Sequence, residues 1–71
     1  MKKDWHEFTL ASGKKIMVRL SAMTEITERI EGELSHNGER FDSGNCWITV
    51  AEDVFAVKET YDEVKQVVLN E

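Results

Sequence analysis

Residues 57–64 read "VKETYDEV", and this stretch marks the change from strand to helix that decides the fold. Thr60 and Glu63 have the spacing of a capping box, in which the threonine hydroxyl accepts a hydrogen bond from a first-turn backbone N–H and the glutamate carboxylate accepts one from the threonine N–H. Asp62 and Glu63 also place negative charge at the positive end of the helix dipole. We therefore predict that a strand ends before Thr60 and that a short helix runs from there towards Glu71.

The predicted helix has one apolar face. Its members, which recur at helical spacing, are Tyr61, Val64, Val67 and Val68. An isolated helix of this length is marginal in water, because helix nucleation is costly. The valines are therefore expected to pack against a sheet and close the core.

Upstream, residues 7–20 read "EFTLASGKKIMVRL" and indicate a β-hairpin. Two runs of alternating apolar and polar residues flank a turn in which Gly13 can adopt a positive φ. The face expected to be buried consists of Phe8, Leu10, Ile16, Val18 and Leu20. The opposite face, expected to meet water or a partner, carries Thr9, Lys15, Met17 and Arg19.

Residues 21–33 allow two interpretations. Their apolar residues fit one face of a helix and also one face of a strand. The β-branched Thr24 and Thr27 favour a strand. We predict a tight turn at residues 21–23 and a strand near residues 25–31, with a helix as the alternative.

The following segment, residues 32–45, is rich in turn-forming residues. It is expected to be one long loop or a short hairpin that turns at Asn37–Gly38, with a second turn at Asp42–Asn45. Two strands are then predicted, at Cys46–Val50 and Val54–Lys58. Their nearly continuous apolar character indicates that both faces of the sheet are covered there.

These elements predict an α+β fold in a single domain spanning residues 1–71. The expected architecture is one small antiparallel sheet of four to five strands with the short C-terminal helix packed on it.

Composition narrows the function. Nine Lys and Arg stand against fourteen Asp and Glu, and the resulting net charge of −5 makes nucleic acid an unlikely partner, because phosphate binding needs positive charge. Cys46 is the only cysteine, so no disulfide can form within the chain, and a lone thiol fits the reducing cytoplasm. No stretch approaches the roughly 20 apolar residues of a membrane span.

The strand-to-helix junction resembles that of the small bacterial flagellar FlbD-like proteins. Their strand ending in "VKES", followed by "xEEV", corresponds to residues 57–64 here, with Thr60 in place of the usual serine. Their first turn corresponds to Ser12–Gly13, and a segment reading roughly "I-x-x-I" corresponds to Ile26 with Ile30. Residues 32–45 are longer than the family's connection.

Similar "VKET" endings followed by an acidic, valine-rich helix also occur in small phage and prophage proteins. The resemblance covers most of the chain and implies a small accessory protein, and no catalytic residues carry over from it.

Candidate chemistry is sparse. A metal site would draw on His6, His36, Cys46 and Asp42, but the spacings CxxC, HxxxH and HExxH are missing, so no metal or other cofactor is expected. Cys46 begins an apolar strand, where a free cysteine packs as a small hydrophobic residue and not as a nucleophile.

Paired carboxylates are expected to be solvated or to cap the helix, because acid–base catalysis needs them to converge in a dry cleft. These pairs are Glu25 with Glu28, Glu52 with Asp53, and Asp62 with Glu63. We therefore expect the protein not to be an enzyme.

Two functions stay open. The first is a protein-interaction module, with an unknown protein partner or a second copy of the chain. Its candidate surface comprises Trp5, Lys14, Lys15, Met17 and Arg19. Tryptophan is enriched in binding hot spots, and we expect Trp5 at the interface and Trp47 mostly in the core. The alternative is a nucleic-acid-binding regulator that uses the hairpin lysines Lys14 and Lys15, together with Lys2, Lys3 and Arg19. Trp5 is available for base stacking.

Overall fold

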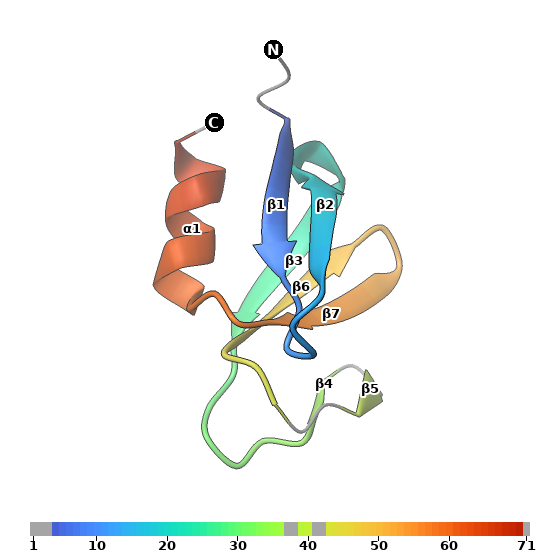
Figure 1. The fold of residues 1–71 in the computed structure, drawn as a ribbon, viewed down its shortest axis with the longest axis vertical. Coiled ribbons are helices and arrows are strands. Elements are labelled where there is room, and N and C mark those ends of the chain that lie inside the picture. The colour runs from blue at the N-terminus through green and yellow to red at the C-terminus, as the bar shows by residue number, and fades with distance from the viewer. Residues whose placement is uncertain (1–3, 37–38, 41–42, 71) are drawn as a thin grey trace.

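The computed structural model describes residues 4–36, 39–40 and 43–70, which form antiparallel strands followed by one helix (Figure 1). The longer strands are β1 (Trp5–Thr9), β2 (Lys15–Arg19), β3 (Met23–Glu28), β6 (Cys46–Val50) and β7 (Asp53–Val57). A 3-10 turn, η1 (Leu20–Ala22), separates β2 from β3, and α1 (Tyr61–Leu69) is the last element. The two-residue strands β4 (Ser35–His36) and β5 (Glu39–Arg40) pair only with each other in the part described. The α+β class, the antiparallel pairing and the C-terminal helix are confirmed.

The prediction of one continuous sheet is wrong. The body contains a two-stranded sheet, β1–β2, and a three-stranded sheet in the order β3–β6–β7. The sheets separate because η1 redirects the chain, so that β3 pairs with β6 instead of β2. One corner joins them: the Ala11 N–H donates to the Ala56 carbonyl at 2.9 Å, and the Lys58 N–H donates to the Thr9 carbonyl at 2.7 Å.

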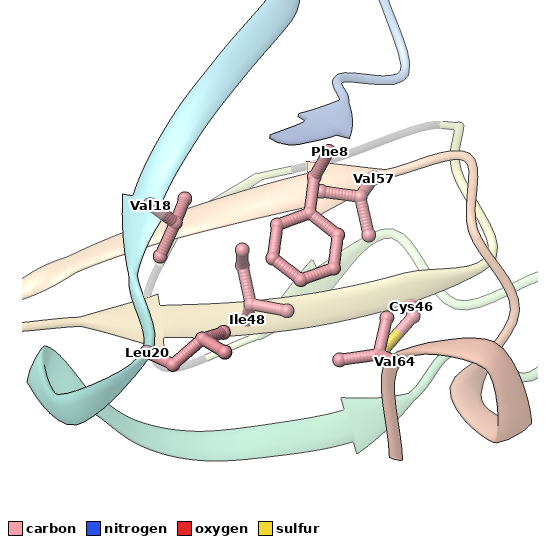
Figure 2. Packing of buried hydrophobic residues seen from close by; sticks show 7 residues of the cluster. All are labelled: Phe8, Val18, Leu20, Cys46, Ile48, Val57 and Val64. Carbon is pink, nitrogen blue, oxygen red and sulfur yellow. The ribbon is translucent and has the colours of Figure 1, made fainter. Parts of the chain in front are cut away.

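The core lies between the two sheets and the helix (Figure 2). The β1–β2 side and η1 contribute Phe8, Val18 and Leu20, whereas β6 and β7 contribute Cys46, Ile48 and Val57, and α1 contributes Val64. The predicted buried face of the first hairpin is therefore confirmed, with Leu10 and Ile16 packed at its margin. The turn of this hairpin uses Gly13 at a φ of 100°, as its position in the sequence predicted.

Residues 21–33 contain a strand, and the alternative of a helix is wrong. The predicted turn is present as η1, but β3 begins at Met23 and ends at Glu28, earlier than predicted. Asp4 holds the turn: its Oδ1 accepts from the Ser21 N–H and its Oδ2 from the Ser21 hydroxyl, both at 2.8 Å. Because η1 ends with Ala22, the chain is already extended from Met23 onwards, and Ile26 pairs with Ile48.

The segment after β3 packs on the outer face of the three-stranded sheet at Trp47. Arg29 secures it by donating from Nε to the Glu33 carbonyl at 3.0 Å and from Nη1 to the Gly44 carbonyl at 3.1 Å. The imidazole of His36 stacks on Trp47, with ring centroids 4.7 Å apart and planes 14° from parallel. Trp47 is 1% exposed, which confirms its predicted burial.

The predicted short hairpin in this segment is present as the β4–β5 pairing. The turn residues Asn37 and Gly38, and Asp42 of the second predicted turn, lie outside the described residues.

The second hairpin, β6–β7, has a two-residue turn. Val50 pairs with Asp53, so Ala51 and Glu52 form the turn and β7 begins one residue before the predicted Val54. Ala51 has a φ of 57°. Its N–H donates to the Ala22 carbonyl at 2.9 Å, and this bond ties the turn to η1.

The capping box at the start of α1 is confirmed. The Glu63 N–H donates to the Thr60 hydroxyl at 3.2 Å, and the Thr60 N–H donates to Glu63 Oε1 at 2.8 Å. Val64 is fully buried, whereas Val67 packs only at the margin of the core. The prediction that Val68 is buried is wrong, since it is 37% exposed near the end of the helix.

Candidate interaction surface

The outer face of the β1–β2 hairpin collects most of the surface predicted from the sequence. In this hairpin Trp5 lies opposite Arg19, and Glu7 lies opposite Met17. Residues directly opposite one another in an antiparallel pair share a face, so these side chains lie away from the core that Phe8 and Val18 enter from the other face. We call Trp5, Glu7, Lys15, Met17 and Arg19 the hairpin face.

The hairpin face exposes large apolar side chains on a well-supported sheet. Trp5 is 41% exposed and Met17 is 54% exposed. The strands beneath them are fixed by Phe8 and Val18, which are 0% and 3% exposed. A side chain held on a buried scaffold loses little further backbone entropy when a partner binds, and this favours affinity.

Arg19 is positioned over Trp5. Its guanidinium carbon lies 5.1 Å from the Trp5 ring centroid, which is within the range of a cation–π contact. Its Nε lies 3.5 Å from Asp4 Oδ2. The two contacts restrain both side chains, so the tryptophan and the arginine present one pre-formed unit.

Lys15 is less restrained. Its Nζ lies 3.5 Å from Glu7 Oε2, and its side chain is 71% exposed. Exposed ion pairs of this kind contribute little stability, so the ammonium group can exchange its partner at small cost. Lys14 does not belong to the hairpin face: it lies in the turn, where its carbonyl accepts from the Leu10 N–H at 2.7 Å.

The two histidines considered for metal binding contact aromatic rings. His6 is partly buried, with its ring centroid 4.8 Å from that of Phe8. His36 stacks on Trp47, and its Nε2 lies 3.5 Å from Glu25 Oε1. Within the described residues, no three His, Cys, Asp or Glu side chains come together as a metal-binding group.

Cys46 is fully buried, as predicted. Burial raises the pKa of its thiol to about 11, and nearby Glu28 and Glu59 add to the rise, while a hydrogen bond with the Thr27 backbone opposes it. The thiolate needed for nucleophilic attack is therefore strongly disfavoured at neutral pH.

All three carboxylate pairs singled out from the sequence are exposed. Glu63 serves the capping box, and Glu52 and Asp53 lie at the β6–β7 turn. Because water surrounds these groups, their geometry gives no dry cleft for acid–base chemistry.

Sequence reasoning missed the acids that organise the hairpin. Asp4 contacts Arg19 and also holds η1, while Glu7 contacts Lys15 across the strand pair. Glu7 could have been found from the hairpin register, because it lies diagonally across from Lys15 once the turn is placed at Gly13. Asp4 precedes the alternating run, so no periodicity marks it.

A shallow hollow of about 320 Å³ lies beside the hairpin turn, between that turn and the outer edge of β7. Apolar side chains form most of its wall, and Arg40 and two serine residues contribute polar groups. Its lining residues are Leu10, Ala11, Ser12, Arg40, Ser43, Val54, Phe55 and Ala56.

In the part of the chain that the structure describes, no helix is both long enough and apolar enough to cross a bilayer. Comparisons with models of protein families, with curated proteins and with solved structures found no significant match to this chain.

Proposed function

We propose that this protein is a small, non-enzymatic interaction module that docks a partner protein on the hairpin face. The observation that carries the proposal is the position of Trp5 and Met17, both exposed, on one rigid face with Arg19 stacked on the tryptophan. Tryptophan, methionine and arginine are enriched in protein interfaces, and a buried anchor of this kind supplies most of the binding free energy.

The charges on this face favour a protein partner over a nucleic acid. Asp4 and Glu7 lie beside Arg19 and Lys15, so each of these cations already has a carboxylate near it. A phosphate backbone carries a charge at every nucleotide and would meet both carboxylates, whereas a protein partner can place single acidic residues opposite the cations alone. Of Lys14 and Lys15, the two hairpin lysines of the nucleic-acid alternative, Lys15 thus already has a carboxylate beside it.

The biological setting belongs to the same proposal. The likeness of "VKETYDEV" to the junction of FlbD-like and prophage proteins suggests a bacterial or phage accessory protein. A single buried thiol is compatible with the cytoplasm, where we place the protein.

The test compares two double variants of the full chain in pull-downs from lysate of the native host. Trp5→Ser with Met17→Ser removes the anchors from the hairpin face. Ile30→Ser with Leu69→Ser is the matched control, because both residues are exposed apolar side chains outside this face, each 65% exposed. Every partner recovered is then purified, and its affinity for each variant is measured.

We expect the hairpin-face variant to lose at least about tenfold in affinity for the recovered partner, as removal of a hot spot does. The control variant is expected to bind as the unmodified chain does. Equal binding by all three proteins would refute the proposal, and recovery of DNA or RNA lost on Lys14→Glu would support the alternative.

A further inference from the structure

The hairpin has one strand edge whose backbone groups face away from β1. The Leu10 N–H donates to the Lys14 carbonyl at one end of the hairpin, and the Leu20 N–H donates to the Asp4 carbonyl at the other. Hydrogen-bonded pairs alternate with non-bonded pairs along an antiparallel ladder. Ile16 and Val18 therefore bond to β1, while the N–H and C=O groups of Lys15, Met17 and Arg19 face outward.

The opposite edge of the hairpin confirms this alternation. The same alternation predicts that the backbone N–H and C=O of Thr9 face away from β2. Its carbonyl accepts from the Lys58 N–H, and its N–H donates to Glu59. That edge of β1 is thus occupied at Thr9. In the described chain β2 pairs with β1 alone, and no turn or loop bonds to the backbone of Lys15, Met17 or Arg19.

The side chains of Lys15, Met17 and Arg19 lie on the hairpin face, so the edge of β2 carries a defined pattern of charged and apolar groups. They alternate cation, apolar residue, cation along the strand. Lys15 and Arg19 have side chains 71% and 57% exposed, and Met17 lies between them. An added antiparallel strand would place its own side chains directly opposite these three.

A second copy of the chain does not suit this edge. The antiparallel pairing that sets the apolar Met17 of one copy opposite Met17 of another also sets cations opposite cations. In the register centred on Met17, Lys15 lies directly opposite Arg19 of the second copy, and like charges directly opposite each other destabilise a sheet. Lysine and arginine on an edge strand therefore prevent self-pairing.

We propose that β2 binds an extended segment of a partner protein as an added antiparallel strand, with acidic residues opposite Lys15 and Arg19 and an apolar residue opposite Met17. This inference rests on the proposed function and names the partner's chemistry. The cations that exclude another copy attract this segment, and the exposed backbone groups of β2 supply the ladder hydrogen bonds. Trp5, opposite Arg19 on β1, extends the apolar contact.

The test is a titration of the ¹⁵N-labelled full chain with the peptide acetyl-Glu-Thr-Val-Thr-Glu-amide, followed by NMR. We expect saturable shifts centred on the amides of Lys15, Met17 and Arg19. The charge-reversed peptide, with lysine at both ends, is expected to bind at least about tenfold more weakly. The double variant Lys15→Glu with Arg19→Glu should invert this preference.

Two methylated peptides isolate the backbone contribution. An N-methyl group on the central valine removes an N–H that faces β2, so it should abolish binding. The same group on the second threonine lies on the far side of the added strand and should be tolerated. Equal binding of both methylated peptides, or unmoved β2 amides at about 5 mM of the parent peptide, would overturn the inference.

Failure of this inference is distinguishable from failure of the proposed function. If Trp5→Ser with Met17→Ser abolishes capture of a partner but the peptide leaves the β2 amides unmoved, edge pairing is refuted and docking on the hairpin face stands. If the peptide pairs with β2 but partner affinity ignores the hairpin-face variant, the proposed function is refuted and edge pairing stands.

Discussion

Glu59 and Thr9, fifty residues apart in the sequence, meet where the two sheets join. Both carboxylate oxygens of Glu59 accept from the Thr9 N–H at 3.0 Å. The neighbouring Lys58 N–H donates to the Thr9 carbonyl at 2.7 Å. Together these bonds satisfy the outward backbone groups of Thr9 and fix the point from which α1 begins.

Replacing Glu59 with alanine should therefore destabilise the whole fold. The partly buried Thr9 N–H would lose its acceptor, at a cost of about 1–3 kcal/mol in the free energy of unfolding. Glu59→Gln keeps one acceptor oxygen and should cost less. Urea denaturation of both variants is the measurement, with Glu52→Ala at the exposed β6–β7 turn as the control; a loss no larger than that of the control would contradict this role for Glu59.

Two glycines with similar backbone angles should respond differently to alanine. Gly13 and Gly44 have φ values of 100° and 102°, but a Cβ on Gly13 meets nothing within 4 Å. A Cβ on Gly44 would lie 3.1 Å from the Ala56 Cβ and 3.2 Å from the Val57 carbonyl oxygen. Both alanine variants carry backbone strain, and Gly44→Ala should lose about 1–3 kcal/mol more because it also overpacks.

Thermal unfolding followed by circular dichroism measures the difference between these two variants. Equal midpoints for Gly13→Ala and Gly44→Ala would show that the β7 backbone moves away from position 44 without cost.

Ala51→Gly should stabilise the protein. Ala51 has a φ of 57°, in the region where a Cβ is unfavourable and glycine is not. Relief of this strain exceeds the entropic cost of glycine, so we expect a net gain of about 0.5–1 kcal/mol. The matched control is Ala56→Gly in β7, where glycine weakens the strand. Equilibrium unfolding of both variants in urea decides, and a loss of stability in both would contradict the expectation.

Removal of the helix cap should cost a predictable amount. Thr60→Ala deletes the hydroxyl that accepts from the Glu63 N–H, and we expect a loss of about 1 kcal/mol. Thr60→Ser retains the hydroxyl and should be nearly neutral. Helix content and the urea midpoint are the readouts, and a full loss on Thr60→Ser would show that the threonine methyl group, not the cap, matters.

Alkaline conditions should destabilise the fold through Cys46. Its pKa is raised from 9.0 to about 11 by burial, so the thiol of the unfolded chain deprotonates first. Below pH 9 the stability contributed by this thiol does not change with pH. Between about pH 9 and 11 rising pH favours the unfolded chain, by roughly 3 kcal/mol in total. Urea unfolding across this range should show a steeper decline for the unmodified chain than for Cys46→Ala. If the unfolding free energies of the two proteins fell equally with pH, Cys46 would not be the cause of the alkaline destabilisation.

Local patterns in the sequence predicted the parts of the fold that depend on near neighbours. The alternation around Gly13 identified the hairpin with its two faces, and the spacing of Thr60 and Glu63 identified the helix start. Sheet division was not predictable in this way, because whether β3 pairs with β2 or with β6 depends on contacts between distant segments. The positive φ of Ala51 was not predictable either, because the β6–β7 turn contains no glycine that would indicate it.

The candidate surface was predicted in part. Strand alternation is sufficient to place Lys15, Met17 and Arg19 on one face, and Trp5 joins them through the hairpin register. The contact of Asp4 with Arg19 was not predictable, because Asp4 precedes the strand and its position depends on η1. The burial of Val68 was predicted wrongly. Helical spacing identifies the apolar face of α1, but it does not show how far along that face the sheet extends.

The burial of Trp47 beneath His36 has a practical consequence, because the only other tryptophan is the exposed Trp5. The chain thus carries two natural fluorophores in contrasting surroundings. Fluorescence from the buried Trp47 should shift to the red on unfolding. Fluorescence from the exposed Trp5 should change when a partner binds the hairpin face. Single Trp→Phe replacements would separate the two spectra, and unfolding and docking could then be followed independently without an attached dye.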